Sequence, residues 1–257
     1  AVQSSAAGTV TDQMGRSVVV PDDPRRVVAL APSITEIVYA LGREDRLVGV
    51  TRFSDFPPAA KHLPRVGSYV HLDLERIVAL APDLCIAVKD GNPKAVIDRL
   101  EALQIPVYAV NPVDLAAIGE TILEVGGLLN ARLAAQSLVA EMNARITAVK
   151  DRVAATTHRP RVFFQIGISP IVSVGSGTFI HELITMAGGT NVAAGAVPYP
   201  RFSREETIAL APEIVIITSM DRNESFLKAQ AEWQQWPEIP AARDRRIHLV
   251  DSDLFDR

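Results

Sequence analysis

An internal repeat is the feature of this sequence that most restricts its fold. Residues 74–84, LERIVALAPDL, return in related form at residues 204–214, REETIALAPEI, so the copies lie 130 residues apart (204 against 74) in a chain of 257 residues. Each copy has the pattern of a short helix stopped by proline and followed by a buried strand. A repeat at half the chain length predicts two similar lobes. Convergence of helix-proline-strand junctions is the alternative explanation, because residues 29–32 also read ALAP in another context.

From Arg26 onward, short apolar runs alternate with helical patterns, which is typical of parallel βαβ units and predicts the α/β class. Between Ala131 and Thr157 neither glycine nor proline occurs, so one long helix is expected there. We therefore predict an N-terminal lobe of residues 1–130, a connecting helix of residues 131–157 and a C-terminal lobe of residues 158–257. Expected strands are 27–30, 47–50, 84–88, 107–110, 161–166, 171–174, 214–218 and 247–250, after a small hairpin around residues 14–15. Expected helices are 33–41, 74–80, 93–103, 113–129, 178–186, 204–210 and 224–233.

Composition excludes several classes of function. The net charge of -4 arises from acidic and basic residues that are mixed along the chain, and no basic run is present that could follow a nucleic-acid backbone. No apolar stretch reaches the roughly 18–20 residues that span a bilayer. Residues 1–5 carry neither an initiator methionine nor a basic signal-peptide region, so we expect a processed chain. The single cysteine, Cys85, lies in an apolar run and is expected to be buried in a strand.

Signatures of catalysis and of intrinsic cofactors are weak. Residues 167–171, GISPI, lack the final glycine of a nucleophile elbow, and residues 175–177, GSG, lack both the third glycine of a dinucleotide site and the lysine of a P-loop. A tight turn before a helix is the expected structure of residues 175–177, with a phosphate cradle as the alternative. The five histidines have no metal-site spacing, so we expect no metal site and no intrinsic cofactor.

Some residues nevertheless suggest binding functions. Tyr69 and His71 carry side chains able to serve as axial ligands of an iron porphyrin or a corrinoid cobalt, or they are simply surface loop residues. Glu75 and Glu205 occupy the second position of the two repeated helices. Stabilisation of the helix dipole explains an acidic residue there, whereas a matched pair also suits docking to arginines of a two-fold partner.

Aromatic residues are few, and several fall in polar or proline-rich loops, where each either packs locally or contacts a ligand. In an α/β protein such loops lie near strand ends, where a large flat ligand can be held. These loop aromatics are Phe53, Phe56, Tyr69, Tyr199 and Phe255.

The sequence resembles the cobalamin-binding branch of the helical-backbone (class III) periplasmic binding proteins for metal chelates and siderophores, over nearly its whole length. The resemblance implies two Rossmann-like lobes joined by a single long helix, a corrinoid ligand held between the lobes, and delivery to an ABC permease in the inner membrane. It further implies a periplasmic, monomeric protein that is not an enzyme. The matching stretches are 32–36 (PSITE), 54–57 (SDFP), 74–84, 91–92 (GN), 162–168 (VFFQIGI), 197–205 (VPYPRFSRE) and 252–255 (SDLF).

Individual site residues follow from this resemblance. Glu75 and Glu205 match the two carboxylates that pair with permease arginines in the family. Tyr69 and Tyr199 stand where a cobalamin binder has tryptophan, which implies a smaller stacking area, and the sequence ends without the C-terminal helical segment of the family, so a less stable second lobe is expected. The residues expected to contact the ligand are Phe53, Phe56, Tyr69, Val88, Ile171, Tyr199, Asp253 and Arg257, of which Val88 and Ile171 are small aliphatic replacements.

Two alternatives remain at this point. In the first, the fold is the same but the ligand differs. It is either haem, with Tyr69 or His71 as axial ligand, or an anionic ferric siderophore bound by Arg52, Arg65 and Arg201. A metal-cluster enzyme on a two-lobed scaffold is the other alternative, which a single cysteine disfavours.

Overall fold

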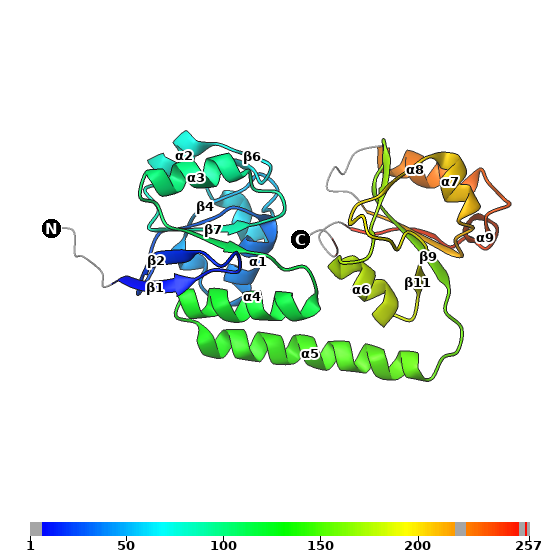
Figure 1. Cartoon of the computed structure of the whole chain (residues 1–257), viewed down its shortest axis with the longest axis horizontal. Coiled ribbons are helices and arrows are strands. Elements are labelled where there is room, and N and C mark those ends of the chain that lie inside the picture. The colour runs from blue at the N-terminus through cyan, green and yellow to red at the C-terminus, as the bar shows by residue number, and fades with distance from the viewer. Residues whose placement is uncertain (1–6, 219–224, 252–254, 256–257) are drawn as a thin grey trace. The chain divides into compact units, whose positions relative to one another are not determined.

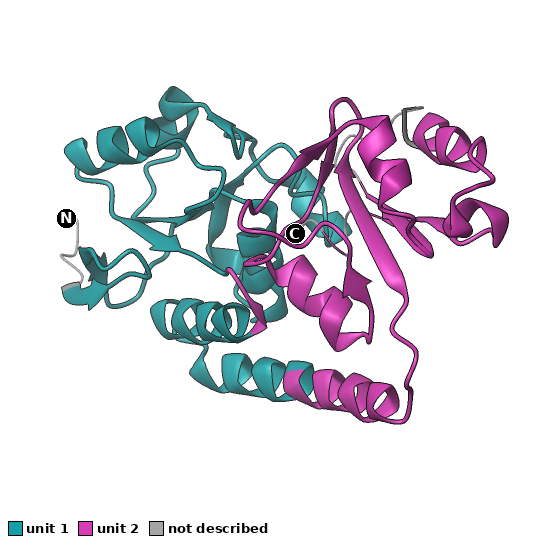
Figure 2. Cartoon of the chain, turned by 45° about the vertical axis from the view of Figure 1, so that its right-hand side comes forward, with its two compact units in different colours: residues 1–112, 116–142 teal, residues 113–115, 143–257 magenta. Residues whose placement is uncertain are grey.

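The computed structural model describes residues 7–218, 225–251 and 255, and the chain divides into two compact units. Unit 1 comprises residues 1–112 and 116–142, and unit 2 comprises residues 113–115 and 143–257 (Figure 2). Both units combine helices with a β-sheet, which confirms the predicted α/β class (Figure 1). The lobe boundaries after residues 130 and 157 stay a prediction.

Unit 1 is built on a four-stranded parallel sheet in the order β4-β3-β7-β8. All three neighbouring pairs are parallel, so each connection must cross over the sheet. The strands are β3 (Val27–Ala29), β4 (Leu47–Val50), β7 (Leu84–Val88) and β8 (Val107–Val110). The last three have the bounds that the apolar runs predict.

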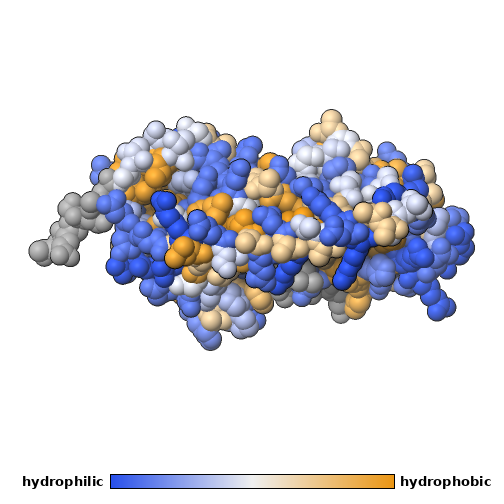
Figure 3. Space-filling model, turned by 90° about the horizontal axis from the view of Figure 1, so that it is seen from below, coloured by the Kyte–Doolittle hydropathy of each residue, from blue (hydrophilic) through white to orange (hydrophobic). Residues whose placement is uncertain are grey.

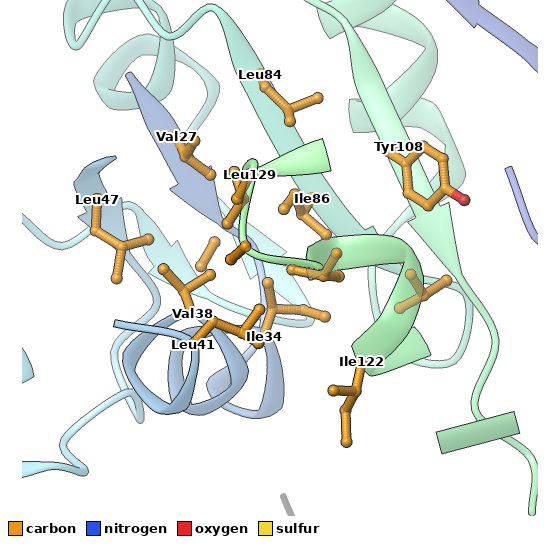
Figure 4. Close-up of a cluster of buried hydrophobic side chains, with 14 of the residues drawn as sticks. Val27, Ile34, Val38, Leu41, Leu47, Leu84, Ile86, Tyr108, Ile122 and Leu129 are labelled. Atoms are coloured by element: carbon orange, nitrogen blue, oxygen red, sulfur yellow. The ribbon is translucent and has the colours of Figure 1, made fainter. Parts of the chain in front are cut away.

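Alternate side chains of these strands enter two separate cores, because successive residues of a strand point to opposite faces. Helices α1 (Pro32–Ala40) and α4 (Leu115–Leu128) cover the first core, which Figure 4 shows. Helices α2 (Leu74–Ala79) and α3 (Lys94–Ala102) cover the second. From β3, β7 and β8, the buried residues of the first core are Val27, Ala29, Leu84, Ile86, Tyr108 and Val110, and those of the second are Val28, Cys85, Ala87, Val107 and Ala109; Leu47 and Val50 of β4 belong to the first core. Cys85 is fully buried in the second core, as predicted, and this burial raises the pKa of its thiol to about 12.

Two hairpins extend unit 1. The predicted one consists of β1 (Ala7–Thr11) and β2 (Ser17–Pro21), and Gln13 in its turn anchors it. The Gln13 side chain donates to Glu124 (2.8 Å) and accepts from the backbone N–H of Asn111. The second hairpin, β5 (Gly67–Ser68) with β6 (His71–Leu72), is too short for a periodic pattern and was not predicted. Two short 3-10 helices, η1 (Glu44–Arg46) and η2 (Pro58–His62), complete the unit.

Unit 2 has a mixed sheet around the central strand β9 (Arg161–Gly167). On one side lie β13 (Ile214–Ile217) and then β14 (Ile247–Leu249), both parallel. On the other side β10 (Ile171–Ser173) runs antiparallel and differs from the βαβ pattern, because residues 168–170 are too few for a crossover. The remaining strands are β12 (Arg201–Phe202), antiparallel to β10, and β11 (Thr190–Asn191), parallel to β9.

Helices cover both faces of this second sheet as well. The α6 helix (Phe179–Met186) completes one core, and α8 (Ser225–Gln234) and α9 (Pro240–Arg243) complete the other. Within the latter the Trp233 indole N–H donates to the buried Gln165 side chain at 2.7 Å. This bond satisfies a polar group that would otherwise destabilise the core.

The predicted long helix is α5 (Arg132–Ala154), whose first part belongs to unit 1 and whose remainder belongs to unit 2. Only Ala135 is buried along it, so α5 is held by few core contacts. Figure 3 views the chain from the side of α5 and shows hydrophilic and hydrophobic side chains interspersed on this face. Among the described helices none is long and apolar enough to cross a bilayer.

The sequence repeat corresponds to a structural repeat. The α2 helix leads into β7, which lies between β3 and β8; α7 (Arg204–Ala209) leads into β13, which lies between β9 and β14. The alanine before each proline has a left-handed backbone, with φ of 44° at Ala81 and 43° at Ala211. Each unit therefore contains the same helix-turn-strand element, down to the conformation of its turn.

Neighbouring glycines of α4 provide a test of packing in unit 1. A Cβ at Gly126 would overlap the Cβ of Ala135 on α5, whereas a Cβ at Gly127 would meet nothing within 4 Å. We predict that Gly126→Ala lowers the free energy of unfolding by about 1–3 kcal/mol through overpacking. Gly127→Ala is the control and should raise it by about 0.5–1 kcal/mol, because alanine favours a helix over glycine. Urea denaturation of both variants measures the difference, and equal effects would contradict close packing of α4 on α5.

Candidate functional site

The carboxyl ends of the unit 1 strands bring several predicted ligand contacts to one edge of the sheet. Phe53 follows β4, Val88 ends β7, and Tyr69 lies in the turn between β5 and β6. This is the edge at which open α/β sheets bind their ligands. The three side chains are half-buried.

Asn92 fixes the position of the Tyr69 turn. Its side-chain N–H groups donate to the carbonyls of Tyr69 and Leu30, each at 2.8 Å. Its side-chain oxygen accepts from the N–H of Val88 at 2.8 Å. Asn92 is only 9% exposed, so these bonds are shielded from water. One amide thus joins the ends of β3 and β7 to the turn that carries Tyr69.

Gly91 allows the ring of Tyr69 to lie directly against the backbone. A Cβ at this position would come within 2.5 Å of the tyrosine ring. Gly91 also has a φ of +123°, a conformation that side chains with a Cβ rarely adopt. In the sequence, residues 91–92 are noticed only because they match the family, and the match assigns them no role. The structure shows what they do: they support the turn that carries Tyr69.

The loop after β4 is held internally and presents its aromatics at the surface. The Arg65 guanidinium donates to the carbonyls of Thr51 (2.8 Å) and Ser54 (2.7 Å). The Arg52 guanidinium lies 5.5 Å from the centre of the Phe53 ring, which is a cation–π contact. Phe56 is 50% exposed. Arg65 therefore shapes the loop, which weakens the prediction that it binds an anionic siderophore.

In unit 2, the segment that carries Tyr199 is bound along β10. The N–H groups of Ser173, Gly175 and Ser176 donate to the carbonyls of Pro200, Pro198 and Gly195, at 3.0, 2.8 and 3.1 Å. Tyr199 is 48% exposed on this segment. Residues 176 and 177 form the expected turn before α6. The N–H groups of residues 175 and 176 are already bonded to carbonyls, which disfavours the alternative of a phosphate cradle.

Two predicted contacts contribute to the cores as well as to the surface. Val88 packs against the first core of unit 1, and Ile171 packs against the core of unit 2 that contains Trp233. Both side chains remain half-buried, so a ligand can still touch them. Asp253 and Arg257, the two polar contacts predicted near the chain end, lie outside the described residues.

The repeated glutamates have matching positions in the structure. Asp73 caps α2 by accepting from the N–H of Arg76 (3.1 Å), and Ser203 caps α7 by accepting from the N–H of Glu206 (3.2 Å). The Glu206 carboxylate in turn accepts from the N–H of Ser203 at 2.7 Å, so Ser203 and Glu206 form a capping box. Glu75 and Glu205 are therefore the second residues of their helices, and both are exposed.

The carboxyl of Glu205 is held in its charged form. Its own backbone N–H donates to it, and the Ser203 hydroxyl and the nearby charge of Arg204 act in the same direction, so its pKa is lowered from the ordinary value. A lowered pKa means that Glu205 is negatively charged at every pH above the ordinary glutamate pKa and keeps this charge at somewhat lower pH as well.

The described residues contain no cluster of three histidine, cysteine, aspartate or glutamate side chains able to hold a metal ion. His71 is exposed on β6, two residues after Tyr69, and its N–H donates to the Ser68 hydroxyl (3.1 Å). That Tyr69 or His71 serves as an axial ligand stays a prediction.

Comparison with known proteins shows what this architecture resembles. The model of a family described as periplasmic binding protein matches residues 27–254. The vitamin B12-binding protein of Vibrio campbellii is 32% identical over 235 residues, which cover 91% of this chain and 83% of that protein. Among solved structures, the periplasmic vitamin B12-binding protein BtuF of Vibrio cholerae is 28% identical with a TM-score of 0.78, covering 91% of this chain and 90% of that one. A periplasmic haem-binding protein from Pseudomonas aeruginosa is 29% identical with a TM-score of 0.83, covering 90% and 85%.

Replacement of Asn92 by aspartate tests whether this side chain fixes the Tyr69 turn. Asn92→Asp keeps the acceptor for Val88 but places oxygen opposite two carbonyls, so we predict a loss of about 2–3 kcal/mol in the free energy of unfolding. Asn130→Asp is the matched control, since Asn130 donates to the carbonyl of Asp22 (2.9 Å) and to the carboxylate of Asp23 (3.3 Å) at an exposed position. Its loss should stay below about 1 kcal/mol, because water can replace both bonds and screens the new charge from that of Asp23. Losses of equal size in denaturant melts would mean that the buried amide is unimportant.

Proposed function

The chain belongs to the periplasmic binding protein family, and from this premise we propose that it is the substrate-binding component of an ABC importer for cobalamin or a related corrinoid. The curated relatives support the corrinoid, since a protein named for vitamin B12 binding aligns with 91% of this chain. On the chain itself, the observation that supports it best is the Tyr69 ring, which Asn92 and Gly91 hold at the ligand-binding edge of unit 1.

The proposed chemistry of binding is that of a large, flat, mostly apolar ring system. Aromatic rings bury a large area against such a ligand and favour stacked or edge contacts. Tyr69 and Phe53 would supply these contacts from unit 1, and Tyr199 would supply them from unit 2. Phe56, Val88 and Ile171 would add apolar area. Asp253 and Arg257 are the proposed polar contacts.

Release of the ligand requires recognition by a membrane partner. We propose that Glu75 and Glu205 pair with arginines of the permease dimer. Charged pairs of this kind guide association and can contribute substantially when they are desolvated in an interface. The repeated helices support this, because they present equivalent carboxylates from two similar units to a partner with two similar subunits.

Haem is the second candidate ligand. Its support is the resemblance to a haem-binding protein, which is as close in sequence as the resemblance to BtuF, and the presence of a phenolate and an imidazole two residues apart in Tyr69 and His71. Haem iron accepts tyrosine or histidine as an axial ligand. Haem ligated by Tyr69 needs the tyrosine oxygen, whereas a corrinoid stacked on Tyr69 needs only the ring.

Calorimetric titration of the wild type, Tyr69→Phe and Tyr69→Ala with cyanocobalamin, cobinamide and haemin separates the two ligands. For a corrinoid that stacks on the ring, we predict one-to-one binding, an unchanged Kd in Tyr69→Phe, and a loss of about 1–2 kcal/mol in Tyr69→Ala. For haem ligated by the phenolate, Tyr69→Phe should weaken binding as much as Tyr69→Ala and shift the Soret band. No binding of either corrinoid below about 10 µM, near -7 kcal/mol, would rule out the proposed ligand.

Docking is tested by substitutions that each remove one negative charge. Glu75→Gln and Glu205→Gln should each weaken binding to the permease about tenfold or more, with an unchanged corrinoid Kd. Glu120→Gln, an equal charge change on the exposed part of α4, is the control and should have no effect. Because the pKa of Glu205 is lowered, its contribution is present above the ordinary glutamate pKa and is lost only as the pH falls through the lowered value. Unchanged docking in both variants, measured by surface plasmon resonance, would refute this role.

A further inference from the structure

The two helices that carry Glu75 and Glu205 are too short to be stable alone. Each has six residues, and isolated helices below about 12–15 residues are marginal in water. The direction in which each carboxylate points therefore depends on what holds the ends of α2 and α7. Asp73 and Ser203 hold the amino ends, as described above.

In unit 1, Arg26 holds the carboxyl end of α2. Its guanidinium donates to the carbonyl of Leu80 (2.6 Å from Nη2, 3.2 Å from Nε) and to that of Ala81 (3.0 Å from Nε). Leu80 is the C-cap of α2, so its carbonyl is one that the helix end leaves without a partner, and a cation is favoured there. The backbone of Arg26 is itself fixed by Asp83, which accepts from the Arg26 N–H (2.9 Å) and donates its own N–H to the Arg26 carbonyl (3.0 Å).

In unit 2, Arg161 holds the carboxyl end of α7 in the same way. Its Nη2 donates to the carbonyl of Leu210 at 2.7 Å. Glu213 accepts from the N–H of Arg161 (2.8 Å) and donates its own N–H to the Arg161 carbonyl (2.8 Å). Asp83 and Glu213 are the acidic residues that follow the prolines of the two repeats. The same arginine-acid pair thus recurs in both units.

Both arginines lie away from the candidate ligand contacts of their own unit. Arg26 directly precedes β3, and Arg161 is the first residue of β9, so both lie at the amino ends of central strands. Val88 and the Asn92-held Tyr69 turn lie at the carboxyl ends. A substitution of Arg26 or Arg161 can therefore change the docking helices without touching the ligand.

We propose that Arg26 and Arg161 are positioning residues for docking: each fixes the end of its helix so that Glu75 or Glu205 points correctly to the permease. This inference rests on the proposed docking function. Arg26 makes three side-chain bonds to the helix end and Arg161 makes one. Arg26 therefore has the larger effect.

Arg26→Lys tests the proposal while keeping the charge. The binding partner in this test is the ABC permease, captured from membranes on the immobilised wild-type chain and then reconstituted in nanodiscs. Arg26→Lys should raise the Kd for this permease about three- to tenfold. Its Kd for cyanocobalamin should stay within about twofold of the wild-type value. In the Glu75→Gln background, the same substitution should change docking by less than about twofold, because Arg26 acts through Glu75. Arg161→Lys with Glu205→Gln forms the corresponding cycle in unit 2.

Matched arginines serve as controls. Arg25 is the neighbour of Arg26, but the Arg25 side chain pairs with Asp23, so Arg25→Lys is the control in unit 1. Arg159→Lys is the control in unit 2, because the Arg159 side chain donates to the Thr156 carbonyl (2.9 Å). Both should dock like wild type. Amide hydrogen exchange should be faster in α2 of Arg26→Lys than in Arg25→Lys.

The outcomes separate the two proposals. Docking weakened by Glu75→Gln but not by Arg26→Lys overturns the positioning role alone, as does an equal loss from Arg26→Lys in the wild-type and Glu75→Gln backgrounds. Weaker docking of Arg26→Lys without faster exchange of α2 also overturns it. Docking that neither Glu75→Gln nor Glu205→Gln weakens overturns the docking function, and the positioning role with it.

Discussion

Burial of the central strands on both faces is the constraint from which the rest of the structure follows. Residues of β3, β7 and β8 alternate between two cores, so neither face can be left to water. Covering both faces of a parallel sheet requires helices in the connections. Because these crossovers keep the strands parallel, all carboxyl ends lie at one edge of the sheet and all amino ends lie at the opposite edge. The candidate ligand contacts of unit 1 lie at the carboxyl edge, whereas Arg26 and Arg161, which bond to the ends of α2 and α7, lie at the amino ends of β3 and β9.

Polar side chains fix the conformation of short loops and helices that are not stable by themselves. A loop has no repeating hydrogen-bond ladder, and a six-residue helix leaves most of its terminal groups without partners. Asn92, Arg65 and Arg26 each supply bonds to backbone groups at such places. They fix the shape of the surface that a ligand or partner meets.

The repeat gives the two units a common element and different surroundings. In both, an arginine at the amino end of a central strand, a proline-stopped helix and an acidic residue form one bonded set. The sheets around this element differ, since β10 and β12 run antiparallel in unit 2. Similar units with different loops suit the proposed function, in which equivalent carboxylates meet the permease and unequal surfaces meet the ligand.

The sequence by itself determined the α/β class, the strands 47–50, 84–88 and 107–110, the long helix and the helix positions of Glu75 and Glu205. These depend on local periodicity, capping and proline, which act over a few neighbouring residues. It missed the β5–β6 hairpin and the direction of β10, whose pairing partners are set by sheet edges and not by any local pattern. Only the tertiary structure decided that Asn92 holds the Tyr69 turn and that Arg26 holds α2, because these bonds join residues 23 and 54 positions apart in the chain. Contacts at such separation leave no periodic signal in the sequence; they arise when the packing of apolar strands brings distant polar groups within hydrogen-bonding reach.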